Sequence, residues 1–94
     1  MAAEEPGLKL LLRLLQDFLK DRLTPDDFCQ QYYEIFNFEL VKEELSLEDL
    51  EVLRNLLTAT SQYSEYEDEL RTIPFYIDEC SLREKVRRSL DLLT

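Results

Sequence analysis

The spacing of apolar residues near the start of the chain most constrains the fold. Apolar side chains recur three and four residues apart there, which is the period of one face of an α-helix. These residues are Leu8, Leu11, Leu12, Leu15, Phe18 and Leu19, with Leu10 and Leu14 widening the stripe. Pro6, preceded by Glu4 and Glu5, suits the first turn, where proline lacks only a donor that would be unpaired. The stripe predicts a helix that packs in a core.

A second helix start is marked by capping residues. Thr24 is followed by Pro25 and two aspartates, a sequence typical of an N-cap and a first helical turn. The link from the first helix is short, so these two helices are expected to be antiparallel neighbours. The expected inner face holds Phe28, Tyr32, Ile35 and Phe36, with Cys29 and Tyr33 beside it. After Asn37 the period weakens, which indicates a last turn and a loop.

Two further helices are predicted by the same signals. Ser46 with Asp49 predicts a helix that runs to about Thr60, and Ser81 with Glu84 predicts a capping box for the last helix. The third helix has two apolar rows, Leu47, Leu50, Leu53 and Leu57, and Val52, Leu56 and Ala59, and is expected to be the most buried. The last helix should bury Leu82, Val86, Leu90 and Leu93 and expose Arg83, Lys85, Arg87 and Arg88.

These four helices define the expected architecture. A chain of 94 residues with 45% hydrophobic residues, one glycine and three prolines suits a single small domain over residues 1–94. Amphipathic helices joined by short links predict an all-α fold, a compact antiparallel four-helix bundle. Polar residues interrupt the apolar stretch 8–19, which is too short for a membrane span.

The expected compartment follows from what the sequence lacks. The start of the chain has no basic flank followed by a small-residue cleavage site, so a cytoplasmic protein is expected. A disulfide bond between Cys29 and Cys80 is one alternative, but in the cytoplasm two reduced thiols are expected.

Charge is concentrated in the middle of the chain. Residues 34–79 hold thirteen acidic and three basic residues, which matches the net charge of −10 of the whole chain. Nucleic acid and anionic membranes select Lys and Arg surfaces, so neither is expected as a direct ligand. The distribution fits a protein that imitates a polyanion and binds a basic protein surface.

The densest acidic segment is residues 63–79, with six carboxylates, three tyrosines and a single cation. Such a density of like charge opposes compaction, which suggests a role in binding. Carboxylates raise the rate of encounter with a basic partner and the specificity of binding to it, and tyrosines supply rigid contact area. Phe75 and Ile77 are expected to anchor the segment to the core after Pro74. The alternative is a solvated acidic turn between two helices.

No catalytic or metal-binding constellation is visible. The chain has no histidine, and Gly7 is its only glycine, which excludes a glycine-rich phosphate loop. The acidic run lacks the alternating Asp and Asn ligands and the central glycine of a calcium loop. We therefore expect no enzyme activity, no catalytic residue, no cofactor and no metal site.

The order of these features resembles the immunity proteins of the colicin D type. The resemblance lies in the leucine-rich first helix, the stretch LTPDDFCQQYYEIFN, the acid-rich connection after the third helix and the closing FYIDECSLREKVRRSLDLL. It covers most of residues 8–94. Related immunity proteins accompany bacteriocins and contact-dependent growth inhibition systems.

The resemblance implies a four-helix protein that binds the nuclease domain of a tRNA-cleaving toxin in a 1:1 complex. Acidic side chains would occupy the basic tRNA-binding cleft in place of phosphates. It implies Glu65, Glu67, Asp68 and Glu69 as phosphate mimics, Asp78 and Glu79 as a flank, and Tyr63 and Tyr66 as aromatic anchors. The alternative function is an acidic helical adaptor, or a nucleic-acid mimic, that binds another basic protein surface.

Overall fold

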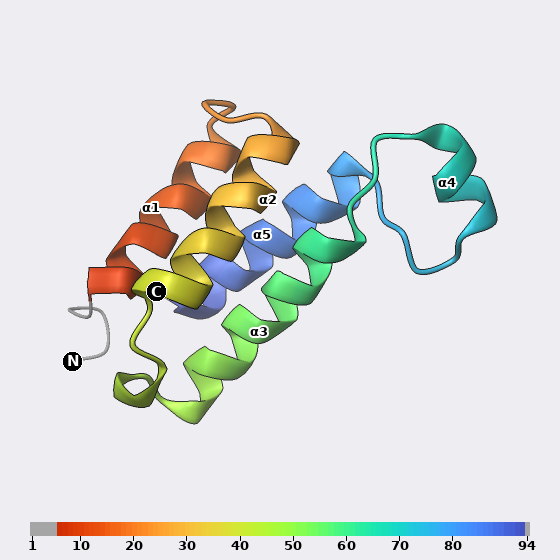
Figure 1. Cartoon of the computed structure of the whole chain (residues 1–94). Coiled ribbons are helices and arrows are strands. Elements are labelled where there is room, and N and C mark those ends of the chain that lie inside the picture. Colours follow the sequence, from red (N-terminus) through yellow and green to blue (C-terminus); the bar gives the residue numbers. More distant parts are fainter. Residues whose placement is uncertain (1–5, 94) are drawn as a thin grey trace.

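The structure, a computed structural model that describes residues 6–93, is built from helices (Figure 1). The α-helices are α1 (Pro6–Leu19), α2 (Pro25–Glu34), α3 (Leu47–Gln62), α4 (Glu67–Thr72) and α5 (Glu79–Leu93). A π-helical turn, η2 (Ile35–Glu39), extends α2, and a 3-10 turn, η3 (Lys42–Glu44), precedes α3. The all-α prediction is confirmed for these residues. They hold five α-helices rather than four, because the acidic segment contains α4. Glu4 and Glu5 lie outside the described residues.

Side-chain caps begin α2 and α3, as predicted. The Thr24 hydroxyl accepts a hydrogen bond from the Asp27 N–H at 3.1 Å, and the Ser46 hydroxyl accepts one from the Asp49 N–H at 3.1 Å. These bonds satisfy donors that a helix leaves unpaired in its first turn.

The predicted capping box of Ser81 and Glu84 is wrong. The last helix begins at Glu79, three residues earlier than a Ser81 cap implies, and Asp78 caps it by accepting a hydrogen bond from the Ser81 N–H at 2.9 Å. Glu84 instead pairs with Arg87 and Arg88 on the surface of α5.

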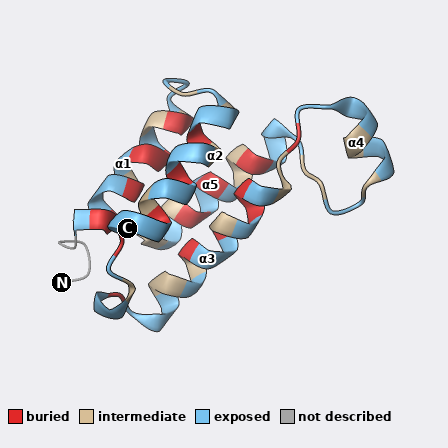
Figure 2. Cartoon of the chain, in the orientation of Figure 1, coloured by how far each residue is buried: buried red, intermediate tan, exposed pale blue. Residues whose placement is uncertain are grey.

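The core lies where α2 and α5 pack against α1 and α3. Most of its members were predicted from the apolar spacing, and their burial is visible in Figure 2. The core residues are Leu8, Leu11, Leu14, Leu15, Phe18, Phe28, Tyr32, Phe36, Leu40, Leu45, Leu53, Leu56, Ala59, Leu82 and Val86. Phe18 stacks on Phe28 with ring centroids 4.3 Å apart. The buried Tyr32 hydroxyl donates to the Leu53 carbonyl at 2.8 Å, so its burial leaves no donor unpaired.

Burial differs from the prediction in several places. The most buried helix is α1, with six buried residues against four in α3. Leu47 was expected in the core but is 84% exposed, because it lies at the first position of α3. Leu10 and Tyr33 are also exposed. Phe75 is 60% exposed, so it is not an anchor, whereas Ile77 does pack against the core.

Gly7 allows α1 to meet the end of η2. A Cβ atom at this position would lie 2.6 Å from the Leu40 Cα and 2.7 Å from the Glu39 carbonyl oxygen. Both neighbours are backbone atoms, which cannot move aside as the end of a side chain can. The close approach of α1 to this turn therefore depends on glycine.

Two further features of the described residues concern membrane insertion and the state of the cysteines. Within residues 6–93, no helix combines the length and apolar character that crossing a bilayer demands. Cys29 and Cys80 are both free thiols, as expected. Burial, together with the nearby Asp26 charge, raises the pKa of Cys29 to about 11, so this thiol is protonated at neutral pH.

Candidate functional site

The chain between α3 and α5 projects from the other helices as a lobe (Figure 1). We call residues 65–76 the acidic lobe. At its base, the Ser64 N–H donates to the Ile77 carbonyl at 3.0 Å, and the Ile77 N–H donates to the Gln62 carbonyl at 2.9 Å. These bonds hold the two ends of the lobe side by side. The lobe is therefore tied to the end of α3 and the start of α5, although most of it is exposed (Figure 2).

Ser64 organises the interior of the acidic lobe. It is buried, and its hydroxyl donates to the Glu69 carboxylate at 2.5 Å and accepts from the Tyr66 N–H at 3.1 Å. Glu67, Asp68 and Glu69 form the first turn of α4. The helix dipole favours carboxylates there, which offsets part of their mutual repulsion. Glu69 therefore has a structural contact, and its carboxylate is turned toward the base of the lobe.

Three carboxylates on the lobe face solvent: those of Glu65, Glu67 and Asp68. Glu67 pairs with Arg71 at 3.1 Å, but both side chains are largely exposed, so the pair contributes little and leaves Glu67 able to contact a partner. Within residues 6–93, Glu65 and Asp68 form no ion pair. Tyr66 is 62% exposed beside them. This outer surface of the lobe is acidic and holds one aromatic ring.

The remaining predicted acids, Asp78 and Glu79, lie at the base of the lobe. The hydrogen bond from the Ser81 N–H, helped by the Ser81 side chain, lowers the pKa of Asp78. Glu79 accepts from the Arg83 guanidinium at 2.8 Å. Both carboxylates thus stabilise the start of α5, although both residues are exposed.

Arg83 was predicted to face solvent, but its side chain is largely buried. Its side chain is 26% exposed and pairs with Asp21 at 2.7 Å as well as with Glu79. It also donates to the Phe18 carbonyl at 2.9 Å, and its guanidinium lies 4.5 Å from the centre of the Phe18 ring. The prediction is wrong because α5 passes the end of α1, which brings the carbonyl and the ring within reach of this arginine.

A groove of about 490 Å³ lies between the base of the lobe and the start of α2. We call it the acidic groove. It brings four carboxylates together around Tyr63, and none of its lining residues is basic. Its lining residues are Thr24, Pro25, Asp26, Tyr63, Ser64, Glu65, Leu70, Asp78 and Glu79. Burial and the charges of Asp26, Glu65 and Glu79 raise the pKa of Tyr63, in keeping with a strongly negative potential.

The structure therefore divides the predicted site residues into three groups. Tyr66, Glu67 and Asp68 lie on the outer surface of the lobe, and Glu65 is exposed there as well as at the acidic groove. Tyr63, Glu65, Asp78 and Glu79 line the acidic groove, and Glu69 binds Ser64 inside the lobe.

Asp26 was missed by the sequence analysis. It was interpreted only as a helix-start charge, and nothing in the sequence indicates that the start of α2 faces the base of the lobe. Ser64 was missed as well, although a serine beside a run of acids is a plausible capping group.

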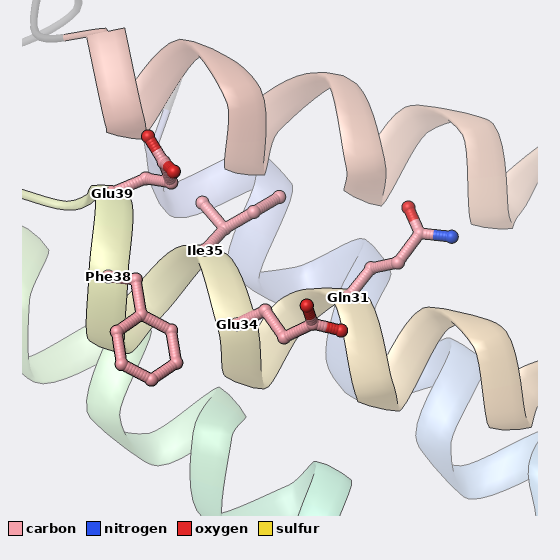
Figure 3. Close-up of a pocket in the computed structure, with 5 residues that line it drawn as sticks. All are labelled: Gln31, Glu34, Ile35, Phe38 and Glu39. Atoms are coloured by element: carbon pink, nitrogen blue, oxygen red, sulfur yellow. The ribbon is translucent and has the colours of Figure 1, made fainter.

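Two of the other hollows involve α2. One, of about 250 Å³, follows the outer face of α2 and η2 and is lined by Gln31, Glu34, Ile35, Phe38 and Glu39 (Figure 3). It contains none of the predicted site residues. The other, of about 480 Å³, lies between α2 and α3. Among residues 6–93, no three His, Cys, Asp or Glu side chains are arranged to hold a metal ion.

Comparisons with known proteins provide no relative. No family description matches the chain, no characterised protein matches its sequence, and no solved structure matches its fold. The function is therefore argued from the geometry and charge of the site.

Proposed function

We propose that this protein is an immunity protein that binds and neutralises the nuclease domain of a tRNA-cleaving toxin. The observation that carries the proposal is the acidic lobe, whose carboxylates project into solvent beside an acidic groove. In this proposal α1, α2, α3 and α5 form an antiparallel four-helix bundle that holds the lobe in place.

The proposed mechanism is mimicry of a polyanion. Glu65, Glu67 and Asp68 stand in for tRNA phosphates in a basic cleft, and Tyr66 supplies aromatic contact area. Complementary charge speeds the encounter, and this effect weakens as salt screens it. The inhibitor acts by 1:1 occupation in the cytoplasm, without turnover, cofactor or metal.

The four carboxylates of the acidic groove suit a lysine or arginine side chain of the partner. Such a charge-assisted contact is stronger than a neutral hydrogen bond, and an arginine has the geometry to bind two oxygens at once. Burying carboxylates is favourable only if each one finds a partner. The partner must therefore present several cations.

Coexpression tests the proposal. The protein is produced together with the C-terminal domain encoded by the neighbouring large secreted-protein reading frame, and growth and intact tRNA are scored. We expect growth and intact tRNA with the protein, and growth arrest with cleaved tRNA without it. Cleaved tRNA despite soluble, folded protein would contradict the proposal and favour the alternative, an acidic adaptor or nucleic-acid mimic that binds another basic surface.

A further inference from the structure

The hollow between α2 and α3, which we call the α2–α3 groove, has an apolar character. Cys29 and Leu57 are half-buried in it, and the ring of Tyr33 stands at its edge, 57% exposed. The complete lining is Cys29, Gln30, Tyr33, Leu57, Thr58, Thr60 and Ser61. None of these side chains is charged at neutral pH.

Three of the four hydroxyl groups in the lining, those on α3, do not make this groove polar. Thr58 donates to the Arg54 carbonyl at 3.2 Å, and Thr60 donates to the Leu57 carbonyl at 2.7 Å. Ser61 donates to the Thr58 carbonyl at 2.7 Å. All three hydroxyl protons are therefore bonded to the backbone of α3, and the groove is better suited to an apolar side chain than to a polar one.

The α2–α3 groove adjoins the acidic groove. Cys29 lies one helical turn after Asp26 on α2, and Ser61 lies two residues before Tyr63. Tyr63 is close enough to the Asp26 carboxylate and to the Cys29 side chain for a negative charge on either one to raise its pKa. An apolar hollow and a strongly acidic one thus lie next to each other, and neither has a basic lining residue.

We propose that the α2–α3 groove binds an apolar side chain of a basic partner segment whose adjacent lysine or arginine enters the acidic groove. Charge complementarity selects this occupant, because four carboxylates beside the apolar hollow favour a cation next to the inserted side chain. The inference rests on the proposed function, in which the partner is basic, and adds that the partner's contact is part apolar.

Two synthetic peptides of equal charge test the inference on the full chain. One is a short amphipathic peptide of leucine and lysine, and the other has glutamine in place of leucine. Because burial of the leucine side chain removes apolar surface from water, we expect the leucine peptide to bind at least about tenfold more tightly. Amide NMR shifts should report its contact at Gln30, Tyr33 and Ser61. Equal affinities for the two peptides, or shifts confined to other residues, would overturn the inference.

Matched variants locate the contact. Tyr33→Ala removes a side chain at the edge of the groove and should abolish the advantage of the leucine peptide. Phe38→Ala removes another exposed aromatic, which lines a different hollow, and should keep that advantage. Thr58→Arg fills the groove from α3, and Asn55→Arg adds the same charge elsewhere on α3. Equal losses within either pair would overturn the inference, since the effect would then not belong to this groove.

The coexpression assay separates the two proposals. Full tRNA protection by Tyr33→Ala, with loss of protection in variants of the lobe acids, would retain the immunity function and reject the apolar contact. Selective leucine-peptide binding without any tRNA protection would retain the contact and reject the toxin as partner.

Discussion

Arg83 joins two parts of the chain that are distant in the sequence, residues 18–21 and the start of α5. Its guanidinium connects the end of α1, the turn at Asp21 and the start of α5. Asp21 has a left-handed backbone with φ of 61°, a conformation that aspartate tolerates better than most residues. The position of Asp21 depends on a conformation that local sequence patterns do not specify, which is why Arg83 was misjudged as a surface cation.

Arg83→Met should lower the free energy of unfolding by about 1–3 kcal/mol. The substitution keeps most of the apolar stem but leaves the Phe18 carbonyl and two carboxylates without this donor. Chemical denaturation monitored by circular dichroism measures the loss. The control is Arg88→Met on the same helix, where the pair with Glu84 is exposed and the change should stay within about 0.5 kcal/mol. Equal effects of both substitutions would show that Arg83 contributes no more than a surface cation.

Gly7→Ala should also destabilise the protein, although alanine is the better helix former. The added methyl group would meet the backbone of Glu39 and Leu40, and such overpacking costs about 1–3 kcal/mol. Thermal unfolding provides the measurement, with the exposed neighbour Lys9→Ala as control. A midpoint at or above that of the parent would mean that α1 and η2 separate without cost.

Among the helices, the starts of α2 and α3 were predictable, whereas the start of α5 and the contacts between helices were not. Thr24 and Ser46 begin α2 and α3 as predicted, because a cap bonds within its own first turn. The capping role of Asp78 was not predicted, because the capping-box signal of Ser81 and Glu84 begins just three residues further on. The Gly7 contact with Glu39 and Leu40 joins distant segments, which local periodicity cannot predict.

The capping role of Asp78 can be separated from its charge. Asp78→Ala should cost about 1 kcal/mol at neutral pH, whereas Asp78→Asn should cost less, because asparagine is an equally good cap. If the asparagine variant is as unstable as the alanine variant, capping is not the role of this residue.

The stabilising effect of Asp78 should depend on pH. Its pKa is lowered in the folded state, so the carboxylate stabilises the fold above the ordinary value of 3.8. This contribution is lost as the pH falls through the folded pKa. The stability difference between the parent and Asp78→Ala should therefore shrink in unfolding curves recorded below pH 3.8. A constant difference across that range would contradict the assigned hydrogen bond.

The substitution Ser64→Ala should loosen the acidic lobe without loosening the rest of the fold. Ser64→Ala removes the bonds to Glu69 and to the Tyr66 N–H, while the two backbone bonds at the base remain. We expect faster amide hydrogen exchange in residues 67–73 and unchanged exchange in α1 and α3. Uniformly faster exchange throughout the chain would show that Ser64 supports the whole fold.

In the molecule as a whole, the acidic side chains of the lobe and the acidic groove lie apart from the apolar core. The all-α class and most of the core followed from apolar spacing, and the density of acids singled out residues 63–79 as a candidate site. The lobe shape, the participation of Asp26 and the contact between Ser64 and Glu69 were not predictable, because each depends on how distant segments meet.

The most direct test of the account compares two charge-matched variants in binding to the purified nuclease domain. One carries Glu65→Gln, Glu67→Gln and Asp68→Asn. The other carries Glu43→Gln, Glu44→Gln and Glu51→Gln, three exposed acids outside the lobe. Each variant loses three negative charges, and Glu69 is kept because it binds Ser64.

We expect at least about 100-fold weaker binding for the lobe variant, since a single close charge pair at an interface contributes on the order of 2–5 kcal/mol. The control variant should lose only a small factor in association rate. Equal losses in the two variants, or undiminished binding of the lobe variant, would contradict the claim that the acidic lobe is the inhibitory surface.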